Sequence, residues 1–237
     1  MFTKFKTDSK RRLLLVGLTS ILALSACSDG GETTVTSGGQ GAFEVADDHA
    51  IGNPDAKVTV TEYASVTCPA CANFHQTSYV AFKKKYIDSG LVRFVFREYP
   101  TAPENIAQAG FLIANCAPEE RFFDVISLQL KRQAQIRQDP RGELEKIARS
   151  AGLSSDDFEA CLQNEEEIAK YKAKVQMGID AGVSGTPSFQ VNGVMTKRTP
   201  SGKQLYTIES WDEVLAPLLG ENAPAPEATD DKESTEQ

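Results

Sequence analysis

The chain has 237 residues, of which 41% are hydrophobic and 24% are charged. This composition is that of an ordinary globular protein and excludes a collagen-like, wholly disordered or polytopic membrane protein. The formal net charge of −8 argues against nucleic-acid binding, because neutralising phosphates requires a basic surface.

The N-terminal segment has the parts of an export signal. Basic side chains precede an apolar run at 13–24 that is short for a membrane span. The sequence LSAC, which ends at Cys27, then resembles a bacterial lipobox, in which this cysteine is lipidated after cleavage. A plain cleavable signal, or an N-terminal anchor with an incidental cysteine, is the alternative. We expect residues 1–26 to be a lipoprotein signal peptide, and the protein to be lipid-anchored to a membrane on the periplasmic side of the cell envelope.

Two polar segments flank the predicted folded unit. Residues 27–50 are rich in Gly, Ser and Thr at first and lack apolar periodicity, so we expect a flexible tether. Residues 221–237 have only Ala and Pro as apolar residues, so we expect a disordered acidic tail. The folded unit is therefore expected to span about 51–220.

The folded unit begins with a β-α-β pattern. Residues 58–64 alternate and predict a strand, 68–86 predict a helix, and 91–96 predict a second strand that pairs in parallel with the first. Apolar residues three and four apart then predict helices at 106–115, 119–134, 143–150, 156–164 and 165–179.

A hairpin and a helix complete the predicted unit. Residues 188–191 and 194–196 flank Asn192-Gly193, which is typical of a type I′ turn, and an amphipathic helix follows at 208–219. The order of elements predicts an α/β sheet domain that is interrupted by a helical insert.

Cys68 and Cys71 carry the strongest chemical signal. The sequence CPAC lies where a strand ends and a helix begins, and the unpaired N–H groups and dipole of a helix start stabilise a thiolate. A lowered thiol pKa makes a cysteine nucleophilic near neutral pH. We expect Cys68 to be the attacking thiol and Cys71, one turn further, to resolve the mixed disulfide.

Two other roles for this motif stay open. It could be half of a zinc site with His75, although the chain has only two histidines and no second C-x-x-C to complete four ligands, or it could be an inert structural disulfide. A c-type haem is excluded because Ala72 stands where a histidine must follow. We expect no metal and no cofactor beyond the redox-active cysteine pair.

Together, these features resemble the DsbA-like form of the thioredoxin fold. The resemblance rests on CPAC after a strand and on GTPSF, at 185–189, before a hairpin. It implies an α/β thioredoxin fold whose halves, 51–100 and 182–220, are separated by an all-helical insert at 101–181. It also implies a thiol:disulfide oxidoreductase that introduces disulfides into exported proteins.

The resemblance assigns roles to single residues. Pro187 matches a cis-proline beside the active site, and Thr186 before it offers backbone groups to the substrate. Glu62 matches a buried acid that helps to move the proton of the resolving cysteine. A trans Pro187 at an edge strand and an outward-facing Glu62 are the alternatives, and His75 is expected to lie on the helix surface.

One position departs from the family pattern. DsbA has histidine before its second cysteine, whereas this chain has Ala70, which cannot donate a side-chain hydrogen bond. We expect a less stabilised thiolate and a weaker oxidant, so the direction of electron flow stays open. Ala70 and Pro69 are also expected to contact the substrate.

The remaining cysteines are expected to form a structural disulfide. In an exported protein, Cys116 and Cys161 should pair, and some DsbA-like proteins carry such a second disulfide; two free buried thiols are the alternative.

The resemblance also implies partners. The expected substrates are exported proteins with free thiols, and the expected recycling partner is a membrane thiol oxidase of the DsbB or vitamin K epoxide reductase (VKOR) type. Residues 28–50 are too short and polar for the dimerisation domain of a DsbC-like isomerase, so we expect a monomer. The alternatives are a periplasmic reductase or isomerase, and a lipid-anchored module that binds a metal or a partner without turnover.

Overall fold

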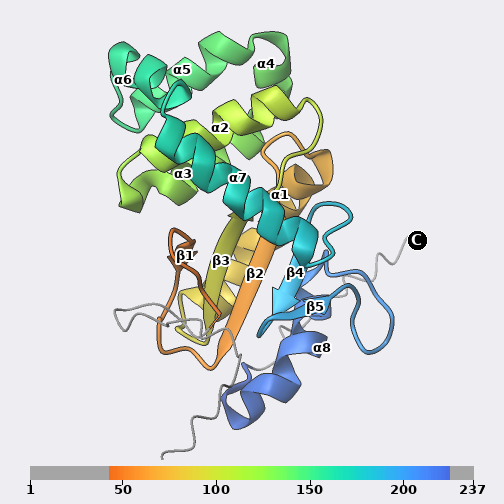
Figure 1. Ribbon diagram of the computed structural model, residues 1–237. Coiled ribbons are helices and arrows are strands. Elements are labelled where there is room, and N and C mark those ends of the chain that lie inside the picture. The colour runs from red at the N-terminus through yellow and green to blue at the C-terminus, as the bar shows by residue number, and fades with distance from the viewer. Residues whose placement is uncertain (1–42, 225–237) are drawn as a thin grey trace, which may run out of the picture. The chain divides into compact units, whose positions relative to one another are not determined.

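A five-stranded sheet forms the centre of the structure, a computed structural model that describes residues 43–224. The predicted signal peptide, Cys27 and the first part of the tether lie outside the described residues. The strand order is β1-β3-β2-β4-β5; β2 and β3 pair in parallel, and the other neighbours pair antiparallel (Figure 1). The strands are β1 (His49–Ile51), β2 (Val58–Ala64), β3 (Val92–Glu98), β4 (Ser188–Val191) and β5 (Val194–Thr196).

A helical insert separates β3 from β4, as the sequence predicts, and lies at the end of the sheet where β2 and β3 end (Figure 1). It has six helices rather than the expected five, because the helix expected at 119–134 is interrupted at Arg132, whose backbone leaves the helical conformation. These helices are α2 (Glu104–Cys116), α3 (Phe122–Lys131), α4 (Gln133–Gln138), α5 (Pro140–Ser150), α6 (Ser155–Leu162) and α7 (Glu165–Asp180). Outside this insert, α1 (Pro69–Phe82) continues into a π-helical turn at Lys83–Ile87, and α8 (Ile208–Leu219) closes the fold. Within residues 43–224, no helix combines the length and apolar character that a membrane crossing requires.

The two faces of the sheet have different coverings. On one face, Trp211 of α8 packs its ring against Phe82 of α1 and Phe189 of β4, with centroids 4.9 Å apart in both pairs. On the other face lies α7. It can approach closely because residue 178 is a glycine: a Cβ at this position would stand 2.6 Å from the ring of Tyr99. Alternation along β2 therefore directs even-numbered residues toward α1 and odd-numbered residues toward α7.

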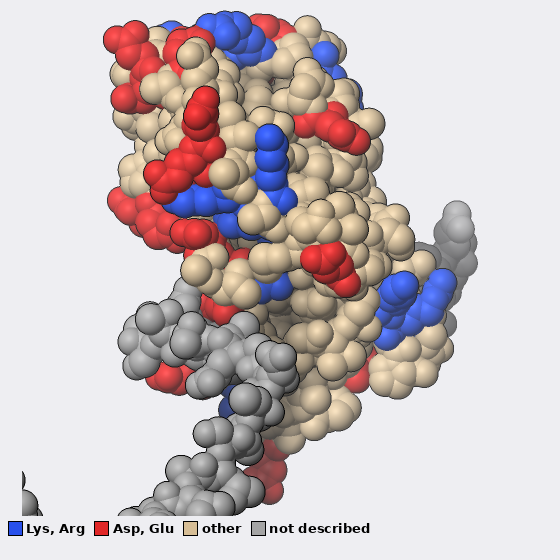
Figure 2. Space-filling view, viewed as in Figure 1, with Lys and Arg blue, Asp and Glu red and all other residues tan. Residues whose placement is uncertain are grey.

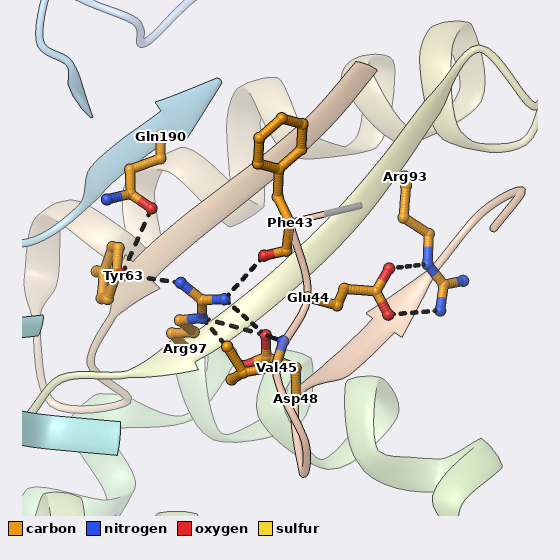
Figure 3. Close-up of polar contacts among 8 residues, drawn as sticks. All are labelled: Phe43, Glu44, Val45, Asp48, Tyr63, Arg93, Arg97 and Gln190. Atoms are coloured by element: carbon orange, nitrogen blue, oxygen red, sulfur yellow. Dashed lines mark hydrogen bonds and ion pairs between the residues drawn. The ribbon is translucent and has the colours of Figure 1, made fainter. Parts of the chain in front are cut away.

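The segment before β1 is held against the face that α7 also covers. Arg97 of β3 donates to both carboxylate oxygens of Asp48, at 2.7–3.2 Å, to the carbonyl oxygen of Phe43 at 3.0 Å and to the hydroxyl of Tyr63 at 3.0 Å (Figure 3). The Asp48 side chain is fully buried. A bidentate pair of this kind fixes geometry more strongly than a single contact.

The boundaries of the folded unit differ from the sequence prediction. The tether was expected to continue to residue 50, but Arg93 also binds Glu44, at 2.7 and 3.2 Å, and His49–Ile51 forms an edge strand. At the other end, the tail was expected from residue 221, whereas Gly220–Asn222 forms a 3-10 turn. Short segments of this kind are ordered by tertiary contacts rather than by their own periodicity.

Candidate active site

The loop after β2 places Cys68 at the N-cap of α1. Its backbone is extended, with φ −81° and ψ 119°, and Pro69 occupies the first turn, where a missing N–H costs nothing. The Cys68 sulfur accepts a hydrogen bond from the backbone N–H of Cys71 at 3.4 Å. The sulfur therefore takes the place of the usual capping oxygen and lies at the positive end of the helix.

These contacts give the two thiols opposite pKa shifts. The pKa of Cys68 is lowered from 9.0 to about 6, mainly by a hydrogen bond from the Cys71 thiol, with help from Thr186 and against the effect of burial. The pKa of Cys71 is raised well above 9.0, first by burial, then by its bond to Cys68 and by the charge of Glu62. At neutral pH, Cys68 is a thiolate and Cys71 is a thiol.

The loop before β4 lies next to this thiolate. The peptide bond between Thr186 and Pro187 is cis, and the Thr186 carbonyl oxygen lies 3.3 Å from the sulfur of Cys68. A surface cavity of about 260 Å³ extends along residues 184–189. On the other side of Cys68, Pro69 and Ala70 are exposed. A substrate that reaches Cys68 can therefore contact both loops.

Glu62 and His75 form a buried pair behind Cys71. Glu62 is fully buried on the face of the sheet that α1 covers, so it does not point outward. Its Oε2 lies 2.8 Å from Nε2 of His75, whose side chain is only 5% exposed. The prediction that His75 lies on the surface was wrong. Cys71, His75 and Tyr79 recur every four residues and so share one helix face, and this spacing is the signal that was missed.

A buried glutamine of the insert holds the active-site loop. Nε2 of Gln133, in α4, donates to the carbonyl oxygens of Val66 and Cys68 at 2.9 and 2.8 Å. Both acceptors lie in the turn between β2 and α1, so the insert fixes the chain on which Cys68 stands. A single glutamine in an amphipathic helix gives no sequence signal of such a role.

The remaining cysteines lie apart from this pair. A disulfide bond joins Cys116, at the end of α2, to Cys161 of α6, with 6.1 Å between their Cα atoms. Cys68 and Cys71 are both free thiols, so the structure shows the reduced site. Across the described part of the chain, no group of three or more His, Cys, Asp and Glu side chains is placed to hold a metal ion.

Comparison with known proteins gives the site a context. Residues 44–209 match the family model described as thioredoxin. A Rickettsia conorii protein with the provisional name protein-disulfide oxidoreductase is 36% identical over 163 residues, which are 65% of this chain and 57% of that protein. The chain thus spans little more than half the length of the curated relatives that it matches.

Solved structures share the arrangement of sheet and insert. The crystal structure of Wolbachia pipientis alpha-DsbA1 matches with a TM-score of 0.67 and 22% identity, covering 76% of this chain and 95% of that one. A protein-disulfide isomerase from Novosphingobium aromaticivorans matches with a TM-score of 0.58 and 26% identity, covering 72% and 97%. With the DsbA-like fold and the family match over most of its length, the chain belongs to the thioredoxin family.

Proposed function

We propose that this chain is a thiol:disulfide oxidoreductase that transfers the Cys68–Cys71 disulfide to exported proteins. The observation that carries the proposal is the different placement of the two thiols: Cys68 caps the helix beside the cis bond of Thr186 and Pro187, and Cys71 is fully buried one turn further. This placement lowers the pKa of Cys68 and raises that of Cys71, and exchange requires one reactive thiolate and one thiol that stays protonated. The provisional name of the Rickettsia relatives, protein-disulfide oxidoreductase, supports the same reaction class.

In the oxidised protein, a substrate thiolate attacks the sulfur of Cys68. A bond forms between substrate and Cys68, the Cys68–Cys71 bond breaks, and Cys71 leaves as a thiolate that takes up a proton. A second substrate thiolate then attacks the substrate sulfur of the mixed disulfide and expels Cys68. The substrate loses two electrons and the cysteine pair gains them. Cys68 is a good leaving group because its pKa is low.

The two loops around Cys68 hold the substrate in this proposal. Thr186 and Pro187 present backbone beside the sulfur, and the cavity along 184–189 offers space for an extended segment. Pro69 and Ala70 border Cys68 on the exposed side. Glu62, behind Cys71, accepts and returns the proton of the resolving thiol.

The cellular setting of the proposal is drawn from the sequence. A lipid on Cys27 anchors the protein on the periplasmic side of the envelope, and residues 28–42 supply the tether. A membrane oxidase of the DsbB or VKOR type restores the disulfide of a monomeric enzyme that needs no cofactor. The pair formed by Cys116 and Cys161 stabilises the insert and takes no part in exchange.

The reduction potential of Cys68–Cys71, measured in glutathione buffers, tests the direction of transfer. An oxidase requires a value well above the roughly −270 mV of thioredoxin, toward the roughly −120 mV of DsbA. A value near that of thioredoxin would replace the oxidase with a reductase or isomerase.

A trapping experiment tests whether the chain is an enzyme at all. In a Cys71→Ser variant, the Cys68 thiolate can still attack a client disulfide, and mixed disulfides between Cys68 and client proteins should accumulate because Cys71 can no longer attack Cys68 and release the client. A binding module without turnover would trap none, and a Cys68→Ser variant serves as the matched control.

A further inference from the structure

Glu62 and His75 each have one polar atom without a partner among the described residues. Oε2 of Glu62 and Nε2 of His75 bind each other, which leaves Oε1 of the acid and Nδ1 of the imidazole without hydrogen bonds, although both atoms are buried. Buried polar groups are normally satisfied, and exceptions call for an explanation. The hydrogen bond between Oε2 and Nε2 joins the two side chains, and each has a second polar atom, Oε1 or Nδ1, that is free to bind a proton. A proton can therefore pass along the pair.

The charge of Glu62 acts on Cys71. The residues paired with Glu62 on β3 and β4 are Phe96 and Phe189, which carry no charge. From α1, the titratable neighbours are Cys71 and Tyr79, and the Glu62 charge raises the pKa of both. Burial is the largest cause of the raised pKa of Tyr79, so this phenol keeps its proton and Cys71 is the group that exchanges one.

The side chain of His75, whose Nδ1 is buried, borders a cavity. This cavity has a volume of about 640 Å³ and lies between α1 and α3. The cavity is at the surface of the protein, because Val80, which also lines it, is 65% exposed. None of its lining residues belongs to the cavity along 184–189. The charged residues that line it are Lys83, Lys84, Asp88 and Lys131.

We propose that His75, placed between buried Glu62 and this cavity, carries the proton of Cys71 to and from solvent on the side of α1 away from the substrate. The inference rests on the proposed function and adds to it a positioning residue and a proton route. Cys71 gives its proton to Oε1 of Glu62, the proton held between Oε2 and Nε2 moves onto His75, and Nδ1–H releases one proton toward the cavity. One proton leaves, the thiolate of Cys71 remains, and the pair of Glu62 and His75 holds as many protons as before.

The reaction of the reduced full chain with oxidised glutathione separates the relevant step. Cys68 first attacks the glutathione disulfide and releases one glutathione thiolate. Cys71 then attacks Cys68 of the mixed disulfide and releases the second. Acid quenching and mass spectrometry follow both steps, and the second alone requires the proton of Cys71 to leave. A positioned proton carrier accelerates such a step by about 10²-fold or more.

We expect His75→Gln and His75→Ala to slow the second step by at least about tenfold and to change its pH profile, with the first step unaffected. Added imidazole should restore the rate of the alanine variant, because it can enter the cavity beside the vacated position. It should not restore Glu62→Gln. A wild-type second step in either His75 variant, or the absence of rescue by imidazole, would overturn the inference.

Two further variants keep the test decisive if His75 proves necessary for folding. Val80→Trp should narrow the rim of the cavity and slow the second step, whereas Ile179→Trp, an exposed position on α7, should not. Equal rates of the second step in these two variants would show that the proton does not reach solvent through this cavity. If the wild-type chain does not exchange with glutathione at all, the proposed function fails first, and a normal first step with an unaltered second step defeats only the role of His75.

Discussion

Cys68 and Cys71 are the same chemical group placed three residues apart, and their surroundings decide which one reacts. Cys68 caps α1 and receives hydrogen bonds from Cys71, whereas Cys71 is enclosed by the core and faces the charge of Glu62. The interaction works in both directions: the bond that stabilises the thiolate of Cys68 also holds the proton on Cys71. This hydrogen bond lowers the pKa of Cys68, and burial, the larger cause, acts with it to raise the pKa of Cys71.

The pH dependence of alkylation should report this assignment. In the reduced protein, the rate at which iodoacetamide modifies Cys68 should rise through a midpoint of about pH 6 and level off by about pH 8. Because the folded pKa lies below 9.0, the Cys68 thiolate stabilises the reduced fold fully above pH 9, and this contribution declines and is lost as pH falls through 6. Site-resolved mass spectrometry measures the rate, and a midpoint near 9 would contradict the assigned roles.

At the scale of elements, the active-site loop depends on the insert as much as on the sheet. The turn between β2 and α1 has two carbonyl oxygens that receive their hydrogen bonds from Gln133 of α4. Thr67 in the same turn donates to the carbonyl oxygen of Thr101, just before α2. The insert is thus part of the scaffold that positions Cys68.

Removing the Gln133 side chain should cost stability. In Gln133→Ala, two buried carbonyl oxygens lose their donor, so we expect the free energy of unfolding to fall by about 1–3 kcal/mol. Urea denaturation of the reduced protein measures the change. Gln135→Ala, an exposed position on the same helix, is the matched control and should have no effect. Equal stabilities of the two variants would show that the contact contributes nothing.

The disulfide between α2 and α6 should stabilise the fold without affecting exchange. Its cysteines are 45 positions apart, and the chain-entropy model gives about 4 kcal/mol for a loop of that length. The double variant Cys116→Ala/Cys161→Ala should lose about this much stability while the reduction potential of Cys68–Cys71 is unchanged. Denaturant unfolding and glutathione equilibration test the two statements separately. A shifted potential would mean that the insert transmits its state to the active site.

The sequence predicts the elements with strong periodicity and misses those that tertiary contacts create. The strand at 58–64, the hairpin with Asn192 and Gly193 in left-handed conformations, and the helix at 208–219 all match the structure. β1 has three residues and exists only because β3 pairs with it. For His75, the spacing from Cys71 and Tyr79 indicates the buried face of the helix, but spacing along one helix does not reveal its partner, Glu62 of β2.

Across the whole molecule, charged side chains are arranged differently at the surface and in the interior. On the face shown in Figure 2, acidic and basic side chains are intermixed over the helices of the insert, where water screens them. Inside, titratable side chains occur as close pairs: Arg97 with Asp48, His75 with Glu62, and Lys174 with Glu98, in which burial raises the pKa of the acid. Two of these pairs join segments far apart in the sequence, and the pair of His75 and Glu62 joins α1 to the strand that precedes it.

Removing one partner of the pair formed by Arg97 and Asp48 should strongly lower the stability of the fold. Asp48→Asn or Arg97→Met leaves a buried charge without its counter-charge, so each should lower the free energy of unfolding by about 3–5 kcal/mol. The double variant should cost clearly less than the sum, because it leaves no unpaired charge. Asp124→Asn, which breaks an exposed pair with Arg121, is the control and should cost at most about 1 kcal/mol.

Because Arg97 and Asp48 lie on the face of the sheet opposite to α1, the rate of Cys68 alkylation should stay at the wild-type value in all the folded variants. Urea unfolding and alkylation, measured on the same samples, separate these effects. Strictly additive losses would show that the two charges are not coupled. A change in Cys68 reactivity would show that the segment 43–48 influences the active site through the sheet, and that the two faces are not independent.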